Sequence, residues 1–124
     1  DEVLASEKVP IQTLDRFCTL KDIPRINYLK IDTEGWDLHV LRGAQSMLAS
    51  HDIDFVEVEA SMHPGNTRHA AYRELCTELE GWSYAIFGVY EQISEQHMTG
   101  AINLRRANFV FVSPRLIKTT RRAK

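Results

Sequence analysis

Acidic side chains gather at two points of the sequence, and these residues are the best candidates for chemistry. Asp32 and Glu34 lie in the segment KIDTEG, while Glu57 and Glu59 precede His63 by a few positions. Each group follows an apolar run, and α/β proteins bind ligands beyond the carboxyl ends of their parallel strands. If the two strands are parallel neighbours, one rim brings together Asp32, Glu34, Glu59 and His63. Crowding and partial burial raise carboxylate pKa values, so Asp32, Glu34 and His63 are candidate general bases.

Two other interpretations of these residues stay open. Acids at a strand-to-helix turn often do no more than cap the helix and complement its dipole. The pair Asp32-x-Glu34, together with His63, could bind a divalent cation through carboxylate oxygens. The spacings among the five histidines do not resemble a ligand pair on one helix or a zinc knuckle, so we predict no metal site. Ser61 and Cys76 lack a nucleophile-elbow setting, and nucleophilic catalysis is not supported.

Strand and helix patterns alternate around these groups. The predicted strands, rich in β-branched and aromatic residues, are Ile26–Asp32, Ile53–Glu59, Trp82–Tyr90 and Asn108–Val112, with Val9–Gln12 as a candidate edge strand. The predicted helices are a short one from Thr13 or Asp15 to Leu20, then Asp37–Leu48 and Arg68–Glu80, with Gly81 as a left-handed cap.

The order of these elements predicts an α/β fold. Helical connections between the first three strands form right-handed parallel units. The last two strands are separated by 17 residues without a helical period, so a long hairpin loop should join them. The sheet should therefore be mostly parallel, with an antiparallel last strand. Two or three helices barely cover four strands, so the chain looks like half of a doubly wound fold.

Composition is typical of a soluble globular protein. The 124 residues suit one domain or part of one, with 44% apolar and 26% charged residues. No apolar run reaches the ~18–20 residues of a membrane span, and the sequence does not start like a signal peptide. We therefore predict a cytoplasmic location, where Cys18 and Cys76 stay reduced.

Charge is distributed unevenly along the chain. Residues 1–62 carry twelve acids and six bases, a charge of −6, whereas residues 63–124 carry five acids and nine bases, a charge of +4. A basic tail at 114–124 holds much of this excess, but it lacks the interleaved aromatic residues of nucleic-acid binding segments. We predict neither a nucleic-acid partner nor a membrane partner.

The segment YLKIDTEGWDLHVLRGAQSML closely resembles the signature of FkbM-type methyltransferases. That pattern reads roughly L-K-I-D-x-E-G-x-E-x-x-V-L-x-G-A, and Asp37 conservatively replaces its second Glu. The matching residues are Leu29, Lys30, Ile31, Asp32, Glu34, Gly35, Val40, Leu41, Gly43 and Ala44. The resemblance extends over about residues 9–113, from the T-L-D turn at 13–15 to the late strand.

The resemblance implies a class I, Rossmann-like fold that uses S-adenosylmethionine to methylate hydroxyl groups, often on sugars or polyketides. In this family the Gly-rich cofactor loop and the acid that binds the ribose belong to the first half of the fold. The six glycines here lie too far apart to build such a loop, so we expect the sequence to start after both features. We predict a single partial domain over 1–124, the C-terminal half of the fold, with negligible cofactor affinity by itself.

The resemblance also implies roles for individual residues. Asp32 matches the acid that ends the fourth strand and faces methyl donor and acceptor, which makes it a candidate for catalysis and for cofactor binding. Glu34 and Gly35 match the turn beside it, and Glu59 matches the end of the fifth strand. The candidate catalytic residues are therefore Asp32, Glu34 and His63, and the candidate substrate-binding residues are Glu59, Lys30 and Trp36.

The leading hypothesis is the acceptor-side half of an S-adenosylmethionine-dependent O-methyltransferase that acts on a small-molecule hydroxyl acceptor. One alternative is a non-catalytic remnant or assembly module of the same fold. Another is a metal-dependent sugar-nucleotide transferase that uses Asp32-x-Glu34.

Two structural expectations follow from the first strand. Lys30 lies beside the acids of the next strand, so we predict a buried or half-buried ion pair with Glu57 or Glu59. The expected loss of a neighbouring strand leaves backbone groups of Ile26–Asp32 unpaired. We therefore predict a homo-oligomer that forms through this edge or through the exposed sheet face.

Overall fold

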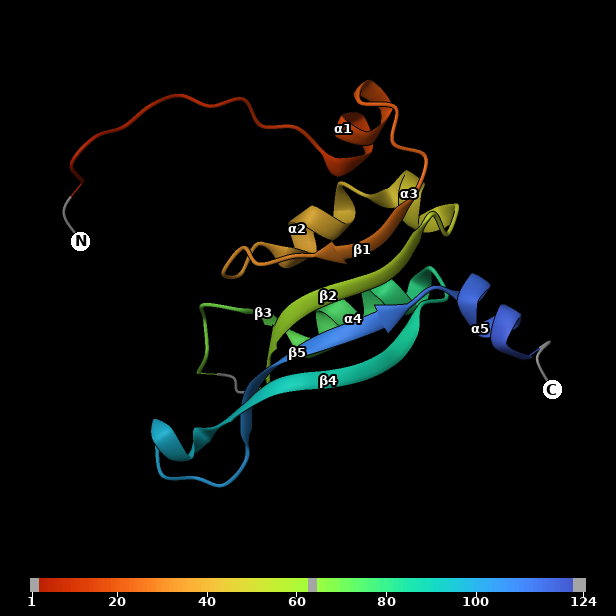
Figure 1. The fold of residues 1–124 in the computed structure, drawn as a ribbon. Helices are drawn as coiled ribbons and strands as arrows, with labels where there is room; N and C mark the ends of the chain where they lie inside the picture. Colours follow the sequence, from red (N-terminus) through yellow and green to blue (C-terminus); the bar gives the residue numbers. More distant parts are fainter. Residues whose placement is uncertain (1–2, 63–64, 122–124) are drawn as a thin grey trace.

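The computed structural model describes residues 3–62 and 65–121, which fold around one mixed sheet (Figure 1). In chain order the elements are α1 (Leu14–Leu20), β1 (Ile26–Lys30), α2 (Asp37–Arg42), α3 (Gln45–Ala49), β2 (Ile53–Ser61), β3 (Ala70–Ala71), α4 (Tyr72–Gly81), β4 (Ala85–Ser94), the 3₁₀ turn η1 (Glu95–His97), β5 (Leu104–Val112) and α5 (Pro114–Arg121).

The sheet has the strand order β1-β2-β5-β4, and the short β3 pairs with the end of β2. β1 and β2 are parallel, in a register that sets Ile26 opposite Ile53 and Lys30 opposite Glu57. β5 is antiparallel to both of its neighbours, so the other four strands all run in one direction. The prediction of a mostly parallel sheet with an antiparallel last strand is confirmed. β5 lies between β2 and β4, joined to β4 by the expected hairpin.

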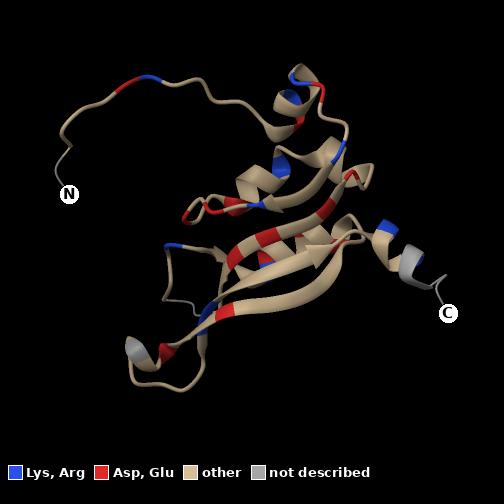
Figure 2. Cartoon of the chain, in the orientation of Figure 1, with Lys and Arg blue, Asp and Glu red and all other residues tan. Residues whose placement is uncertain are grey.

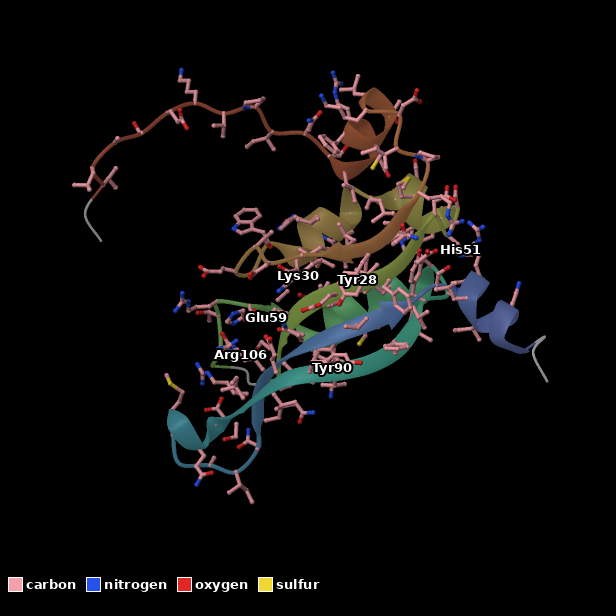
Figure 3. All side chains as sticks on the ribbon, viewed as in Figure 1. Tyr28, Lys30, His51, Glu59, Tyr90 and Arg106 are labelled. Carbon is pink, nitrogen blue, oxygen red and sulfur yellow. The ribbon has the colours of Figure 1, made fainter. Side chains whose placement is uncertain are left out.

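The two faces of the sheet have different surroundings. Val56, Val58 and Ala60 of β2 are fully buried toward the helices, and α4 lies behind β2 and β5 in Figure 1. The opposite face, here called the open face, has a hollow of about 220 Å³ lined by Tyr28, Phe55, Phe87, Tyr90 and Val110. Tyr28 and Tyr90 on this face are 50% and 47% exposed (Figure 3). The helices α1 to α4, whose buried residues share one core cluster with those of β2, therefore cover one face of the sheet.

The prediction of a single helix after the KIDTEG segment is wrong, because the structure has two helices there, α2 and α3, separated at Gly43. The start of α1 packs into this break. Asp15 accepts hydrogen bonds from the backbone N–H groups of Ser46 and Met47 at 2.8 and 3.1 Å, which caps α3. The N–H of Asp15 donates to the Gly43 carbonyl at 3.0 Å. Thr13 caps α1 as predicted, by accepting from a backbone N–H in its first turn.

Two other expected boundaries are also wrong. Val9–Gln12 forms no strand, and its side chains are exposed. α4 begins at Tyr72 instead of Arg68, because Ala70–Ala71 pairs with β2 as a strand. Pairing across the sheet satisfies backbone groups that a longer helix would otherwise have bonded.

The ends of the last two helical segments differ from expectation as well. α4 includes Gly81, and the residue with positive φ is Ser83, at 68°. α5 occupies most of the region predicted only as a basic tail. Cys18 and Cys76 are both free and buried, in agreement with the prediction of reduced thiols. None of the helices in 3–62 and 65–121 has the length and apolar character needed to cross a membrane.

Candidate functional site

An open pocket of about 400 Å³ lies where β1 and β2 end, beside the β4–β5 hairpin. This rim pocket is lined by Asp32, Glu34, Glu59, Asn66, Arg68, His69, Met98, Arg105 and Arg106. Figure 2 shows acidic residues along β2 and basic residues near the β4–β5 hairpin. The structure thus brings Asp32, Glu34 and Glu59 together, as parallel neighbouring strands require.

Glu59 is the most constrained carboxylate of the rim pocket. It is paired with His69 Nε2, and its Oε1 also accepts a hydrogen bond from Arg106 Nη1 at 3.0 Å (Figure 3). Asn66 Oδ1 accepts from the N–H of Arg68, and His69 Nδ1 lies 3.1 Å from Asn66 Nδ2 and 3.2 Å from Asn66 Oδ1. Because a carboxylate only accepts, His69 Nε2 is the donor to Glu59. Glu59 is therefore held in one orientation by two basic side chains.

Asp32 is the open carboxylate of the same pocket. Its side chain is exposed, and no hydrogen bond or ion pair joins it to another residue of the described part of the chain. Glu34 lies 3.7 Å from Arg68, but their side chains are 73% and 76% exposed, so water screens the pair. An ionised carboxylate without an internal partner keeps its lone pairs for a ligand. Asp32 is thus the rim group best able to accept a proton from a bound hydroxyl.

The loops that carry these residues touch behind the pocket. Gly35 has φ +110°, and a Cβ there would lie 2.6 Å from the backbone carbonyl oxygen of Arg68. Glu34, just before it, also has a positive φ of 51°. Glycine is required at this position, because both the backbone conformation and the close approach exclude a side chain. The contact keeps Glu34 and Arg68 side by side.

Lys30 lies outside the pocket lining, exposed at the end of β1 (Figure 3). The predicted ion pair is wrong: among described residues no ion pair includes Lys30. Glu57, opposite Lys30 in the register, instead accepts hydrogen bonds from Tyr28 and Asn108 at 2.5 and 2.8 Å. The bond to Glu57 raises the pKa of Tyr28 to about 12, so this phenol stays a donor at ordinary pH. Glu59 is occupied by the two basic residues named above, which leaves Lys30 in solvent.

Trp36, a candidate substrate-binding residue, is not among the described residues that line the rim pocket. Trp36 is 63% exposed and lines a separate hollow of about 390 Å³ beside α2, where its ring centroid lies 4.8 Å from that of His39. His63 lies outside the described residues. The predicted role of Trp36 in substrate binding remains a prediction.

Sequence reasoning missed His69, Asn66 and Arg106. His69 and Asn66 lie in the loop between β2 and β3, and no spacing to Glu59 marks them. Arg106 reaches the rim because the antiparallel register sets it opposite Ser61, just past Glu59. The available signal was weak: polar residues stand at the start of the β5 strand, whereas its later residues are apolar.

The strand order and directions are those of part of a Rossmann-like methyltransferase sheet, with one antiparallel strand inserted next to a parallel edge. The family model described as the methyltransferase FkbM domain matches residues 1–86. The chain therefore belongs to the FkbM methyltransferase family. No curated protein and no solved structure matches it significantly. Within the described residues, no group of three or more His, Cys, Asp or Glu side chains could hold a metal ion.

Proposed function

We propose that the protein is an S-adenosylmethionine-dependent O-methyltransferase whose acceptor is a hydroxyl of a sugar, a polyketide or a related small molecule. One observation carries this proposal: an open carboxylate, Asp32, shares a pocket with a carboxylate fixed by His69 and Arg106. Family membership supports methyl transfer as the reaction.

Asp32 is the general base in this proposal. Its carboxylate, which has no partner among the described residues, accepts the proton of the acceptor hydroxyl, which makes the oxygen a stronger nucleophile. Glu34 is the second choice for this role, because its ion pair with Arg68 is exposed to solvent and therefore weak. His63 is the third choice.

The acceptor would be held by the fixed side of the pocket. Glu59 accepts hydrogen bonds from hydroxyls, and the remaining N–H groups of Arg106 and Arg68 donate to ligand oxygens. Side chains that alternate between acceptors and donors suit a ligand with several hydroxyls better than an apolar one. This pattern favours a sugar-like acceptor.

The rim pocket also fits the charge of the cofactor. S-adenosylmethionine would supply a methyl group on a positively charged sulfur, and the acceptor oxygen would bond that methyl carbon while the sulfur leaves as a neutral thioether. The exposed carboxylates of Asp32 and Glu34 would attract that positive charge. No pair of glycines in the sequence is spaced as a phosphate or nucleoside loop, so we assign no residue here to the adenosine. The two free thiols support a reducing compartment, and we propose the cytoplasm.

The experiment is transfer of a tritiated methyl group from S-adenosylmethionine, catalysed by the full-length gene product, to a panel of sugars and polyketide alcohols. Label should appear in at least one acceptor and disappear with Asp32→Asn, while calorimetry shows retained cofactor binding. Cofactor binding without transfer to any acceptor would favour the non-catalytic alternative. Activity that requires added manganese and a sugar nucleotide would favour the metal-dependent transferase.

A further inference from the structure

A fully buried carboxylate stands behind the rim pocket. Asp37, the first residue of α2, is 1% exposed and lies outside the pocket lining. Its Oδ1 accepts from the N–H and the hydroxyl of Thr33, at 3.3 and 2.5 Å. Its Oδ2 accepts from the N–H of Glu59, at 3.1 Å. One side chain therefore bonds the loop that carries Asp32 to the strand end that carries Glu59.

The bonding pattern requires a carboxylate at this position. Both oxygens of Asp37 face donors only, and an ionised carboxylate is the side chain that only accepts. An amide of the same shape would place its NH₂ group against the N–H of Thr33 or of Glu59. That contact would leave a buried donor without an acceptor and push the two segments apart.

We propose that Asp37 is the positioning residue that sets the distance between Asp32 and Glu59. Asp32 directly precedes Thr33, so a bond that fixes the Thr33 backbone also fixes the start of the Asp32 side chain. Glu59 donates its own N–H to the second oxygen of Asp37. The backbone positions of Thr33 and Glu59 are therefore both fixed by the Asp37 carboxylate. This inference rests on the proposed methyl transfer, in which Asp32 takes the proton and Glu59 holds the acceptor.

Asp37 should have a large effect on turnover for a residue that lies outside the pocket lining. A displacement of 1 Å between reacting groups costs on the order of 10²-fold in rate. Asp37→Asn should therefore lower turnover by about 10- to 100-fold. The Michaelis constant for S-adenosylmethionine should stay within about twofold, because Asp37 lies outside the pocket.

Asp54 provides a matched control, because it lies on β2 at the opposite end from Glu59. Asp54 is also buried, at 7% exposure, and also accepts from two partners, Arg25 and Asn27. Asp54→Asn makes the same chemical change far from the rim pocket. It should reduce stability and leave turnover unchanged.

The experiment compares the two variants in the full-length protein by two independent readouts. The first is turnover with tritiated S-adenosylmethionine and the acceptor found active for the parent. The second is amide hydrogen exchange by NMR at Thr33 and Glu59, whose protection should fall about tenfold in Asp37→Asn and not in Asp54→Asn. If Asp37→Asn fails to fold, Thr33→Val removes the hydroxyl contact alone and should lower turnover about threefold.

The two readouts separate this inference from the proposed function. Parent protein without methyl transfer would overturn the proposed function, while loss of protection at both amides would still show that Asp37 joins the two segments. Unchanged turnover in Asp37→Asn, in a parent that is active, would overturn the positioning role. Equal turnover losses in Asp37→Asn and Asp54→Asn would overturn the positioning role as well, because both carboxylates would then act only by stabilising the folded state.

Discussion

The two ends of the β1–β2 pair each hold a buried carboxylate, and they differ in what surrounds it. At the amino end, Asp54 accepts from Arg25 and Asn27 at 2.5 and 3.1 Å. The hydroxyl of Tyr84 donates to the Ile53 carbonyl at 2.6 Å, and Tyr84 is 2% exposed. Asp54 and Tyr84 are buried and each is bonded to a neighbouring group, whereas the donors Arg25 and Asn27 remain exposed.

The carboxyl end has the same kind of buried anchor in Asp37, but it adds groups that face outward. Asp32 is open, and Glu59 is oriented toward the pocket by His69 and Arg106. An anchor alone therefore does not make a site. A site needs an anchor together with side chains that keep unused bonding capacity.

Pocket size does not distinguish the two ends. A larger hollow, about 620 Å³, lies near the amino end, and its lining includes the acids Asp15, Asp22 and Asp52. Asp15 caps α3, and Asp52 lies 3.5 Å from Arg115. Among the residues that the structure describes, no histidine or arginine lines that hollow. The difference teaches that the chemistry of the lining, and not its volume, identifies the candidate site.

The largest expected effect comes from breaking the open carboxylate. Asp32→Asn should lower turnover by ~10²–10⁴-fold, because a general base is lost while the fold is kept. Its melting temperature should match that of the parent, since Asp32 is exposed and bonds to no described residue. Initial rates with tritiated cofactor and a thermal melt on the same preparation measure both. Unchanged turnover would move the base to Glu34 or His63.

A matched pair of arginines sharpens the comparison. Arg106 and Arg25 have equally exposed side chains, 37% each, and each pairs with a carboxylate on β2. Arg106→Leu should raise the Michaelis constant for the acceptor about tenfold, because Glu59 loses a charged hydrogen bond. Arg25→Leu should instead lower the free energy of unfolding by about 1–2 kcal/mol without affecting that constant. Steady-state kinetics and urea unfolding of both variants test this prediction. A raised Michaelis constant in Arg25→Leu, with only a stability loss in Arg106→Leu, would contradict the placement of the site at the carboxyl end.

Alkaline pH, combined with a substitution of Tyr84, tests the amino end. Burial, as the main cause, raises the pKa of Tyr84 from 10.0 to about 12. Because the folded pKa lies above the unfolded one, the stabilisation is complete below pH 10 and is lost as pH rises toward 12. Tyr84→Phe should therefore lose less stability between pH 9 and pH 11 than the parent does. Urea midpoints at the two pH values measure this difference, and parallel losses would show that Tyr84 does not titrate as its burial requires.

The smallest expected effect concerns the lateral edges of the sheet. β1 is regular and unpaired on its outer side in the described structure, whereas edge strand β4 carries register shifts that discourage pairing. We expect self-association at micromolar concentration through β1, so Tyr28→Lys should weaken it about fivefold. Tyr90→Lys, at nearly equal exposure beside β4, is the control. Sedimentation velocity measures both.

Each outcome of the sedimentation experiment has a distinct meaning. Equal weakening by Tyr28→Lys and Tyr90→Lys would assign the contact to the open face instead of the edge. A parent that stays monomeric at all concentrations would contradict self-association altogether.

The sequence by itself determined the features that depend on neighbouring residues. Runs rich in β-branched and aromatic residues located β1, β2 and β5, because such side chains fit the pleated surface of a sheet. The same local logic placed Asp32 and Glu34 directly after a strand, where parallel sheets bind ligands. The signature around these residues identified the family, because it depends only on residue types and their spacing along the chain.

Only the tertiary structure decided which side chains complete the site. Arg106 meets Glu59 across 47 positions of sequence, and that meeting depends on the register between β2 and β5. A register shift of one residue would turn Arg106 toward the opposite face of the sheet. The missing ion pair of Lys30 likewise could not be predicted from the sequence. Its neighbour Glu57 was predictable, but the partners that Glu57 takes instead, Tyr28 and Asn108, were fixed by packing across three strands.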